Sequence, residues 1–275
     1  MQDQSHDRGP SRRLVVPREH GAWGMVFIPF FTAVLVAPRV SLVVGVALAA
    51  VLFAFLLRYP VELLILPQSY IRAGRPPKTL LVRSAWVYSV LLVGAGLALV
   101  WVWKLYALLL LAGLAGGLFL FRIRQGLRGA ERGLSSELLG TAGLTLSALV
   151  AWVAATGRLD SAGWLIWLLN CGFFTGGVLY VKSRLRARVA RHQPGEHPST
   201  GIAIAFHVLL LLLVLGLVAA TSASILLAVP FLLAAARAVW GLRDVRRAFA
   251  LSRLGWSEVA LSLIFAGFIA WSFPV

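Results

Sequence analysis

The sequence predicts an all-α protein, a polytopic membrane bundle of about nine transmembrane helices with the N-terminus inside and the C-terminus outside. Hydrophobic residues make up 60% of the 275 residues, and they gather in long uninterrupted segments. A helix crosses a hydrocarbon core of about 30 Å with roughly 20 such residues. Stretches such as residues 208–214 do not alternate apolar and polar residues, which excludes the strands of a membrane β-barrel.

Nine apolar segments follow one another along the chain. They are residues 22–37, 40–57, 80–102, 104–121, 137–156, 161–181, 202–219, 222–240 and 257–273. The first two are separated only by Pro38 and Arg39, so we expect an antiparallel hairpin there. Residues 1–17 are expected to form a polar disordered tail, and residues 18–275 a single transmembrane domain. Cys171 is the single cysteine, which excludes an intramolecular disulfide and a cysteine-rich metal site.

The basic residues predict the orientation of these helices. Of the 26 Lys and Arg residues, 23 fall in the tail, in alternate connections or in the span ends beside them, and the other side receives only Arg39, Lys104 and Arg158. By the positive-inside rule, the richer side is cytoplasmic, which predicts a multi-pass protein of the cell's inner (cytoplasmic) membrane. The net charge of +16 is therefore explained by topology and by contact with anionic lipids, and no nucleic acid partner is expected.

Polar residues at the cytoplasmic ends of the helices are the candidates for function. Glu19 and His20 precede the first span, where they could bind a polar ligand, and Gly21 and Gly24 permit close helix approach. An ordinary charged flank is the alternative interpretation. We expect polar residues to gather at this rim and not near the middle of the membrane.

A second group follows the second span. Arg58 and Glu62 lie four residues apart, so they can pair on one helix face, and Pro60 between them is expected to bend the helix. Arg75 and Lys78 come soon afterwards and could hold an anionic head group. The alternative is a salt bridge at a helix end followed by a solvated loop.

For two further groups of basic residues, a role in structure or in anchoring to lipid is the favoured interpretation. The region from Arg122 to Arg132 is expected to be a loop, with Ser135 or Ser136 capping the next helix and Glu137 complementing its dipole. In the stretch that begins at Lys182, that residue and Arg186 could share a site, while Arg184 and Arg188 face lipid head groups.

Polar and small residues inside the helices are interpreted as packing groups. The glycines at 172 and 176 predict close packing of the sixth helix, and His207 in the seventh is expected to be a satisfied packing group.

The residues Pro17-Arg18-Glu19-His20-Gly21-Ala22-Trp23-Gly24 resemble the signature of the YwiC-like family of bacterial integral membrane proteins. More distantly, the order of helices and cytoplasmic loops resembles UbiA-type intramembrane prenyltransferases. Arg75-Pro76, Leu139-Gly140 and Thr156-Gly157 are similar to residues of that superfamily. The resemblance implies a UbiA-like arrangement of helices and an isoprenoid substrate.

The aspartate-rich motifs that hold magnesium in UbiA-type enzymes are missing from this sequence. The matching regions carry Arg58, Glu62 and Arg75, then Lys182 and neighbouring arginines. Magnesium requires several oxygen ligands, which these regions do not offer, so we expect no metal site. We expect Arg and Lys to hold an anion directly, through charge-assisted hydrogen bonds. The cofactor is unknown.

Two classes of function remain open. The first is a divergent prenyltransferase-like enzyme or other lipid-handling protein, in which Arg58, Arg75, Lys78, Lys182 and Glu19 bind the substrate and His20 or Glu62 is the acid/base candidate. The second is a transporter or a lipid- or quinone-binding protein without catalysis. In both, membrane lipids are the expected partners.

Overall fold

The computed structural model describes residues 14–17, 20–37, 40–67, 75–129, 133–190, 200–221, 223–243 and 251–273. All regular structure in these ranges is helical, as predicted. The elements are α1 (His20–Val36), α2 (Leu42–Ile65), α3 (Lys78–Leu97), η2 (Ala98–Val102), α4 (Ala107–Leu127), α5 (Leu134–Thr145), α6 (Ser147–Thr156), α7 (Ser161–Ala190), α8 (Gly201–Ala220), η3 (Ile225–Ala228), α9 (Val229–Arg243) and α10 (Leu251–Ser272).

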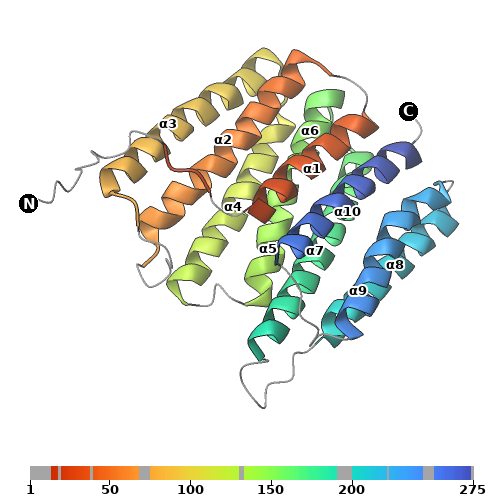
Figure 1. Ribbon diagram of the computed structural model, residues 1–275. Helices are drawn as coiled ribbons and strands as arrows, with labels where there is room; N and C mark the ends of the chain where they lie inside the picture. The colour runs from red at the N-terminus through yellow and green to blue at the C-terminus, as the bar shows by residue number, and fades with distance from the viewer. Residues whose placement is uncertain are drawn as a thin grey trace, which may run out of the picture.

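The helices form a multi-pass membrane bundle. Eight of the described helical segments are long and apolar enough to cross a membrane, and α1 is a shorter apolar helix of 17 residues. In Figure 1 the helices run side by side, with α2 and α3 at one edge, α8 and α9 at the other, and α1, α10 and α7 between them. Each predicted span has a helix in the described chain.

Successive spans run in opposite directions, so the bundle has two distinct ends. One end of the bundle carries most of the described cationic side chains at its helix termini, and we call it the basic end. It holds the C-terminal ends of α2, α4, α7 and α9 and the N-terminal ends of α3, α5, α8 and α10. Contacts across it, such as Arg122 of α4 with Glu62 of α2, fix this common level. The other end is called the opposite end.

Exposed tryptophans mark two levels along the bundle. Trp86 on α3 and Trp256 on α10 lie near the basic end, and Trp101 and Trp271 lie 15 residues further along the same two segments; all four are exposed. Fifteen residues correspond to about 22 Å of helix. Indole rings favour the two interfaces of a bilayer, so these pairs are placed as two aromatic belts.

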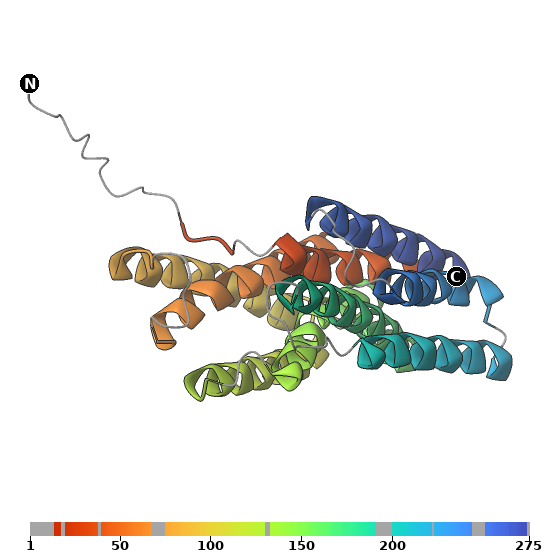
Figure 2. The ribbon, with the colours of Figure 1, turned by 60° about the horizontal axis from the view of Figure 1, so that its bottom comes forward.

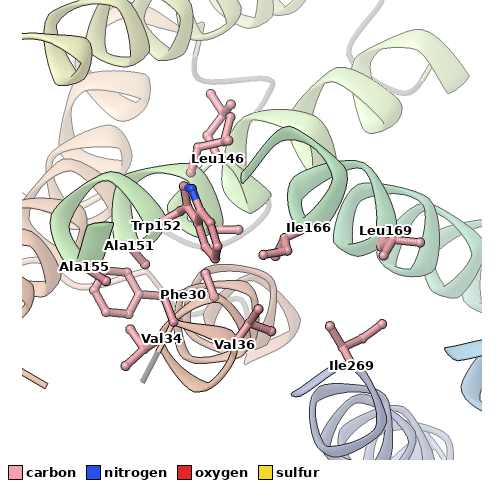
Figure 3. Close-up of a cluster of buried hydrophobic side chains, with 14 of the residues drawn as sticks. Phe30, Val34, Val36, Leu146, Ala151, Trp152, Ala155, Ile166, Leu169 and Ile269 are labelled. Atoms are coloured by element: carbon pink, nitrogen blue, oxygen red, sulfur yellow. The ribbon is translucent and has the colours of Figure 1, made fainter. Parts of the chain in front are cut away.

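The hydrophobic core lies mainly in the half of the bundle near the opposite end. Phe30, Leu149, Ile166 and Phe265 are fully buried there, on α1, α6, α7 and α10. Figure 3 shows α1 and α6 side chains of this core facing one another, with Ile166, Leu169 and Ile269 beside them. Alanines such as Ala148 add no bulk, which lets the helix backbones approach in lipid, where packing rather than the hydrophobic effect drives association.

The predicted helical hairpin of the first two spans is present, but its two helices have other main partners. α1 packs chiefly against α6 and α10, whereas α2 packs chiefly against α3. Figure 2 shows α2 and α3 extending away from the central helices. The short connection therefore fixes the directions of α1 and α2 without making them a tightly packed pair.

The fifth span is broken into two helices. α5 ends at Thr145 and α6 begins at Ser147, with Leu146 between them. Ser147 Oγ donates a hydrogen bond to the carbonyl of Val26 on α1, at 2.7 Å, and Thr145 Oγ1 donates to the carbonyl of Thr141. Hydroxyl groups on the two sides of the break thus bond to carbonyls of α1 and α5, and Ser147 connects the break to α1.

Several boundaries differ from the sequence-based predictions. α2 continues eight residues beyond 57 and passes through Pro60, and α4 continues six beyond 121, so Arg122 and Arg124 are helical and not in a loop. Neither Ser135 nor Ser136 caps α5; its N-cap is Gly133, because the helix starts earlier than predicted.

The described chain also packs from Leu14 onward, within the segment predicted to be a disordered tail. The Val15 amide donates to Ser84 Oγ at 3.0 Å, and Tyr88 Oη donates to the Val15 carbonyl. Residues 1–13 lie outside the described part of the chain.

Candidate functional site

Glu62 is the centre of a charged cluster at the basic end. It lies in the last turn of α2 and is only 4% exposed. Arg122 of α4 donates from Nε to Glu62 Oε1 at 2.7 Å. Arg58, one turn earlier on α2, places its Nε 3.8 Å from the same oxygen, which is the pairing predicted from their spacing. A buried carboxylate is costly unless it is paired, so two guanidinium groups offset its burial.

Arg122 reaches Glu62 because α4 continues past its apolar segment. The longer helix carries this side chain into the interior, between α2 and α5. On α5, a methyl group built at Gly140 would lie 3.3 Å from Nη1 of Arg122. A larger residue at that position would therefore press on the guanidinium.

A second ion pair lies further along α5. Lys182 Nζ of α7 is 2.6 Å from Glu137 Oε2 of α5. Because Glu137 and Gly140 are three residues apart on α5, they lie on the same side of the helix, and the Lys182 pair is about one turn away from the Glu62 cluster. Glu137 is in the first turn of α5, as predicted, but it also binds Lys182, a contact that was not predicted.

Arg75 and Lys78, the other predicted ligands on this side, have different settings. Arg75 Nη2 donates to the carbonyl of Leu66, the residue that follows α2. This hydrogen bond pairs a carbonyl at the C-terminal end of α2 that has no partner within the helix. Lys78 is the first residue of α3 and is exposed.

The residues at the start of α1 are described in part. Glu19 lies outside the described residues, and His20 is the first residue of α1, with its side chain outside the description. The nearby Trp23 meets Phe55 of α2 edge to face, with ring centroids 4.9 Å apart. Arg58 lies over the same Phe55 ring at 5.5 Å. The first turn of α1 thus reaches the part of α2 that carries Arg58.

We expected Arg186 to share a site with Lys182 and Arg184 to face lipid head groups, and this expectation is wrong. Arg184 is buried and donates from Nη1 to the carbonyl of Gly241 on α9 at 2.8 Å, whereas Arg186 is exposed. The end of α9 packs against this side of α7 and presents its terminal carbonyl to Arg184. Arg188 lies in α7, and its side chain is outside the description.

The expectation that polar groups keep to the rim is also wrong. Asn170 and His207 are buried within their spans, and Glu258 of α10 lies seven residues inside its helix, beside Arg237 of α9. The signal was available in the sequence, because an ionisable residue inside an apolar span is rare. The predicted start of the last span at 257 concealed it by placing Glu258 at the interface.

The cluster around Glu62 suits an anion better than a metal. Among the described side chains, Arg58 and Arg122 lie beside Glu62, Lys182 lies beside Glu137, and Arg75 binds the Leu66 carbonyl at the end of α2. Each carboxylate already contacts a cation, at 2.7 Å or less. Within the described residues, no three His, Cys, Asp or Glu side chains come together as metal ligands would. A phosphate or carboxylate would find charge-assisted hydrogen-bond donors here.

Comparison with known proteins gives a family match for the half of the chain that holds Glu62. Residues 16–152 match the family model described as "YwiC-like protein". The chain is 27% identical over 186 residues to "Uncharacterized protein YwiC" of Bacillus subtilis (strain 168), a match that covers 65% of this chain and 70% of that protein. No solved structure matches the chain significantly. Arg58, Glu62 and Arg122 fall within the family match, whereas Lys182, Arg237 and Glu258 follow it.

Proposed function

We propose that this multi-pass membrane protein handles a lipid with an anionic head group at its basic end. The proposal takes account of the match of residues 16–152 to the YwiC-like family. The head group, such as the diphosphate of an isoprenoid, is bound by Arg58, Arg75 and Lys182, with Arg122 and Glu62 holding the site in shape. In this proposal the protein lies in the cytoplasmic (inner) membrane with the basic end facing the cytoplasm.

The observation that carries the proposal is the burial of Glu62 beside two guanidinium groups. Arg122 and Arg58 lie 2.7 and 3.8 Å from one carboxylate oxygen. Each guanidinium has five N–H donors in a planar fork, the arrangement that best matches the oxygens of a phosphate. Charged groups held inside a membrane bundle are expensive and usually mark a ligand path.

The distribution of apolar packing supports the same location. The hydrophobic core fills the half near the opposite end, whereas the buried ion pairs of Glu62 lie toward the basic end, where they offer polar partners to a lipid head group. Exposed apolar side chains on α3 and α4, such as Val90 and Leu110, offer the adjoining surface to acyl or isoprenyl chains.

A reaction at this site would be of the prenyl-transfer class, on a UbiA-like scaffold. Glu62 is engaged by Arg122, so its first role in this proposal is to position the cations. A role as acid or base requires it to exchange that partner for the substrate. His20, at the start of α1, remains the second acid/base candidate.

Native mass spectrometry of the purified protein with its co-purifying lipids tests the proposal. The wild-type protein should retain an anionic isoprenoid or phospholipid through desolvation, and Arg58→Gln should reduce the bound fraction by roughly tenfold, as loss of one charge-assisted contact implies. Arg158→Gln is the matched control, because Arg158 is 75% exposed and paired with Asp160 at the opposite end. Equal lipid retention by the two variants would refute the site.

Transport is the second candidate, and the broken span supports it. The interruption between α5 and α6 lies within a single span, at the buried Leu146, and Ser147 bridges it to α1. Discontinuous helices of this kind occur at the binding sites of transporters. Uptake of a lipid analogue into proteoliposomes, measured on both leaflets without chemical change of the analogue, would favour this candidate over an enzyme.

A further inference from the structure

A second cluster of ionisable groups lies inside the C-terminal helices, separate from Glu62. Glu258 of α10 forms an ion pair with Nη1 of Arg237 on α9. The guanidinium of Arg237 also lies over the ring of Tyr180 on α7, 4.3 Å from its centroid. Arg237 and Glu258 lie six or seven positions inside the ends of α9 and α10, which is about 10 Å along a helix. Glu258 lies two residues beyond Trp256, about 3 Å along the helix, so the pair lies just inside the aromatic belt at the basic end.

His207 of α8 belongs to the same cluster through its contact with α7. A methyl group built at Gly176 would lie 2.9 Å from Nε2 of His207, and one at the adjacent Gly177 would lie 3.0 Å from Oε2 of Glu258. Two neighbouring glycines thus bring an imidazole and a carboxylate against one short stretch of α7. The predicted close packing at Gly176 is present, and its partner is a basic side chain.

The hydrogen bonds of His207 define its chemistry. Its Nδ1 lies 2.7 Å from the carbonyl of Ala203, and because a carbonyl only accepts, Nδ1 carries the proton. Nε2 is then a basic nitrogen with a lone pair. The side chain is 3% exposed, and no described polar atom lies within hydrogen-bond distance of Nε2. The prediction of a satisfied packing histidine is therefore correct for Nδ1 and wrong for Nε2.

We propose that Glu258, Arg237, Tyr180 and His207 form a proton-binding site at the basic end, just inside the aromatic belt, in which Glu258 takes up and releases the proton. In the unprotonated state the carboxylate neutralises Arg237. Uptake of one proton forms an O–H bond on Glu258 and leaves Arg237 with the face of Tyr180 as its remaining described partner. Cation–π contact with Tyr180 lowers the cost of that state. On release, Nε2 of His207 is the basic nitrogen in the cluster that can accept the proton.

The described elements around Glu258 bring a small set of other titratable groups. α9 contributes Arg237, α8 contributes His207, and α7 contributes Tyr180 and, further along, Arg184, which binds the Gly241 carbonyl. α1 also packs against α10, but it has no titratable residue between Gly21 and Val36. The side chain of Glu258 is 26% exposed on a lipid-facing helix, so a hydrophobic reagent can reach it.

Infrared spectroscopy and carbodiimide labelling together test the site in full-length protein in liposomes. A carboxylic acid C=O band should appear as the pH is lowered from about 9 to about 5, and it should be missing in Glu258→Gln. Dicyclohexylcarbodiimide, which modifies protonated carboxyl groups in membranes, should label Glu258 with a yield that rises roughly tenfold across the same range. Glu258→Gln keeps the shape of the side chain and a hydrogen-bond acceptor for Arg237, so it should fold.

His207→Gln separates this proposal from a purely structural ion pair. Glutamine cannot accept a proton at this position, so the midpoint of the infrared titration should shift when the base is removed. A permanent Arg237–Glu258 pair would show no titrating band, no pH-dependent labelling and no effect of His207→Gln. Any of these three results would overturn the proposal, whether or not the site around Glu62 binds a lipid.

Discussion

The Oε1 atom of Glu62 accepts a hydrogen bond from Nε of Arg122, 2.7 Å away and 60 residues later in the chain. This bond joins the ends of α2 and α4 through the interior of the bundle. It makes the geometry of the candidate lipid site depend on a tertiary contact, and it leads to the first of four predictions.

Arg122→Ala should destabilise the protein by about 3 to 5 kcal/mol, because it removes the shorter of the two described cation contacts from the buried Glu62 carboxylate and leaves the longer one to Arg58. Thermal unfolding in a mild detergent measures the change. Arg124→Ala is the matched control, since Arg124 lies on the same turn of α4 and is exposed. Similar unfolding temperatures for the two variants would mean that the Glu62–Arg122 bond contributes little.

Gly163→Ala should destabilise the packing of α7 against α6. A methyl group at Gly163 would lie 2.5 Å from Cδ1 of the Trp152 indole, a rigid ring held by its hydrogen bond to Asp160. Overpacking of this kind costs about 1 to 3 kcal/mol. Gly216→Ala has open space and should be neutral or slightly stabilising by helix propensity. The reverse order of stabilities would contradict the close contact between α6 and α7.

The orientation of the bundle can be measured by cysteine labelling in a Cys171→Ser background. A membrane-impermeant maleimide added from outside should label a cysteine appended after Val275 and should not label one at position 69 or 194. The reason is the concentration of 23 of 26 basic residues on one side. Labelling at position 69 or 194 in intact cells, without labelling at the C-terminus, would invert the assignment.

Lipid binding at the basic end should not depend on magnesium. Glu62 and Glu137 contact Arg122 and Lys182 and come from different helices, so they do not provide the several oxygen ligands that the ion needs. Binding of a prenyl diphosphate, measured by native mass spectrometry, should be the same with and without a chelator. A large loss on chelation would indicate a metal-bridged site.

The sequence was sufficient to predict the helical spans, because each is a long apolar segment and the constraint from lipid is strong. It was also sufficient to pair Arg58 with Glu62, since that contact is local. It did not predict the contacts of Glu62 with Arg122, Glu137 with Lys182, or Arg184 with Gly241. These depend on which helices become neighbours and on how far each helix continues beyond its apolar part, and neither is encoded in local spacing.

The length of α1 has a consequence for the bilayer around the protein. Its 17 residues span about 26 Å, which is several ångströms less than the hydrocarbon thickness of an average bilayer. Phe31 and Leu35 keep one side of this helix exposed, so lipid meets the short span directly. Hydrophobic mismatch of this sign is relieved by local thinning of the membrane. We expect this thinning to draw phosphate groups toward the level of Trp23 and Phe55, and so toward Arg58, which lies over the Phe55 ring.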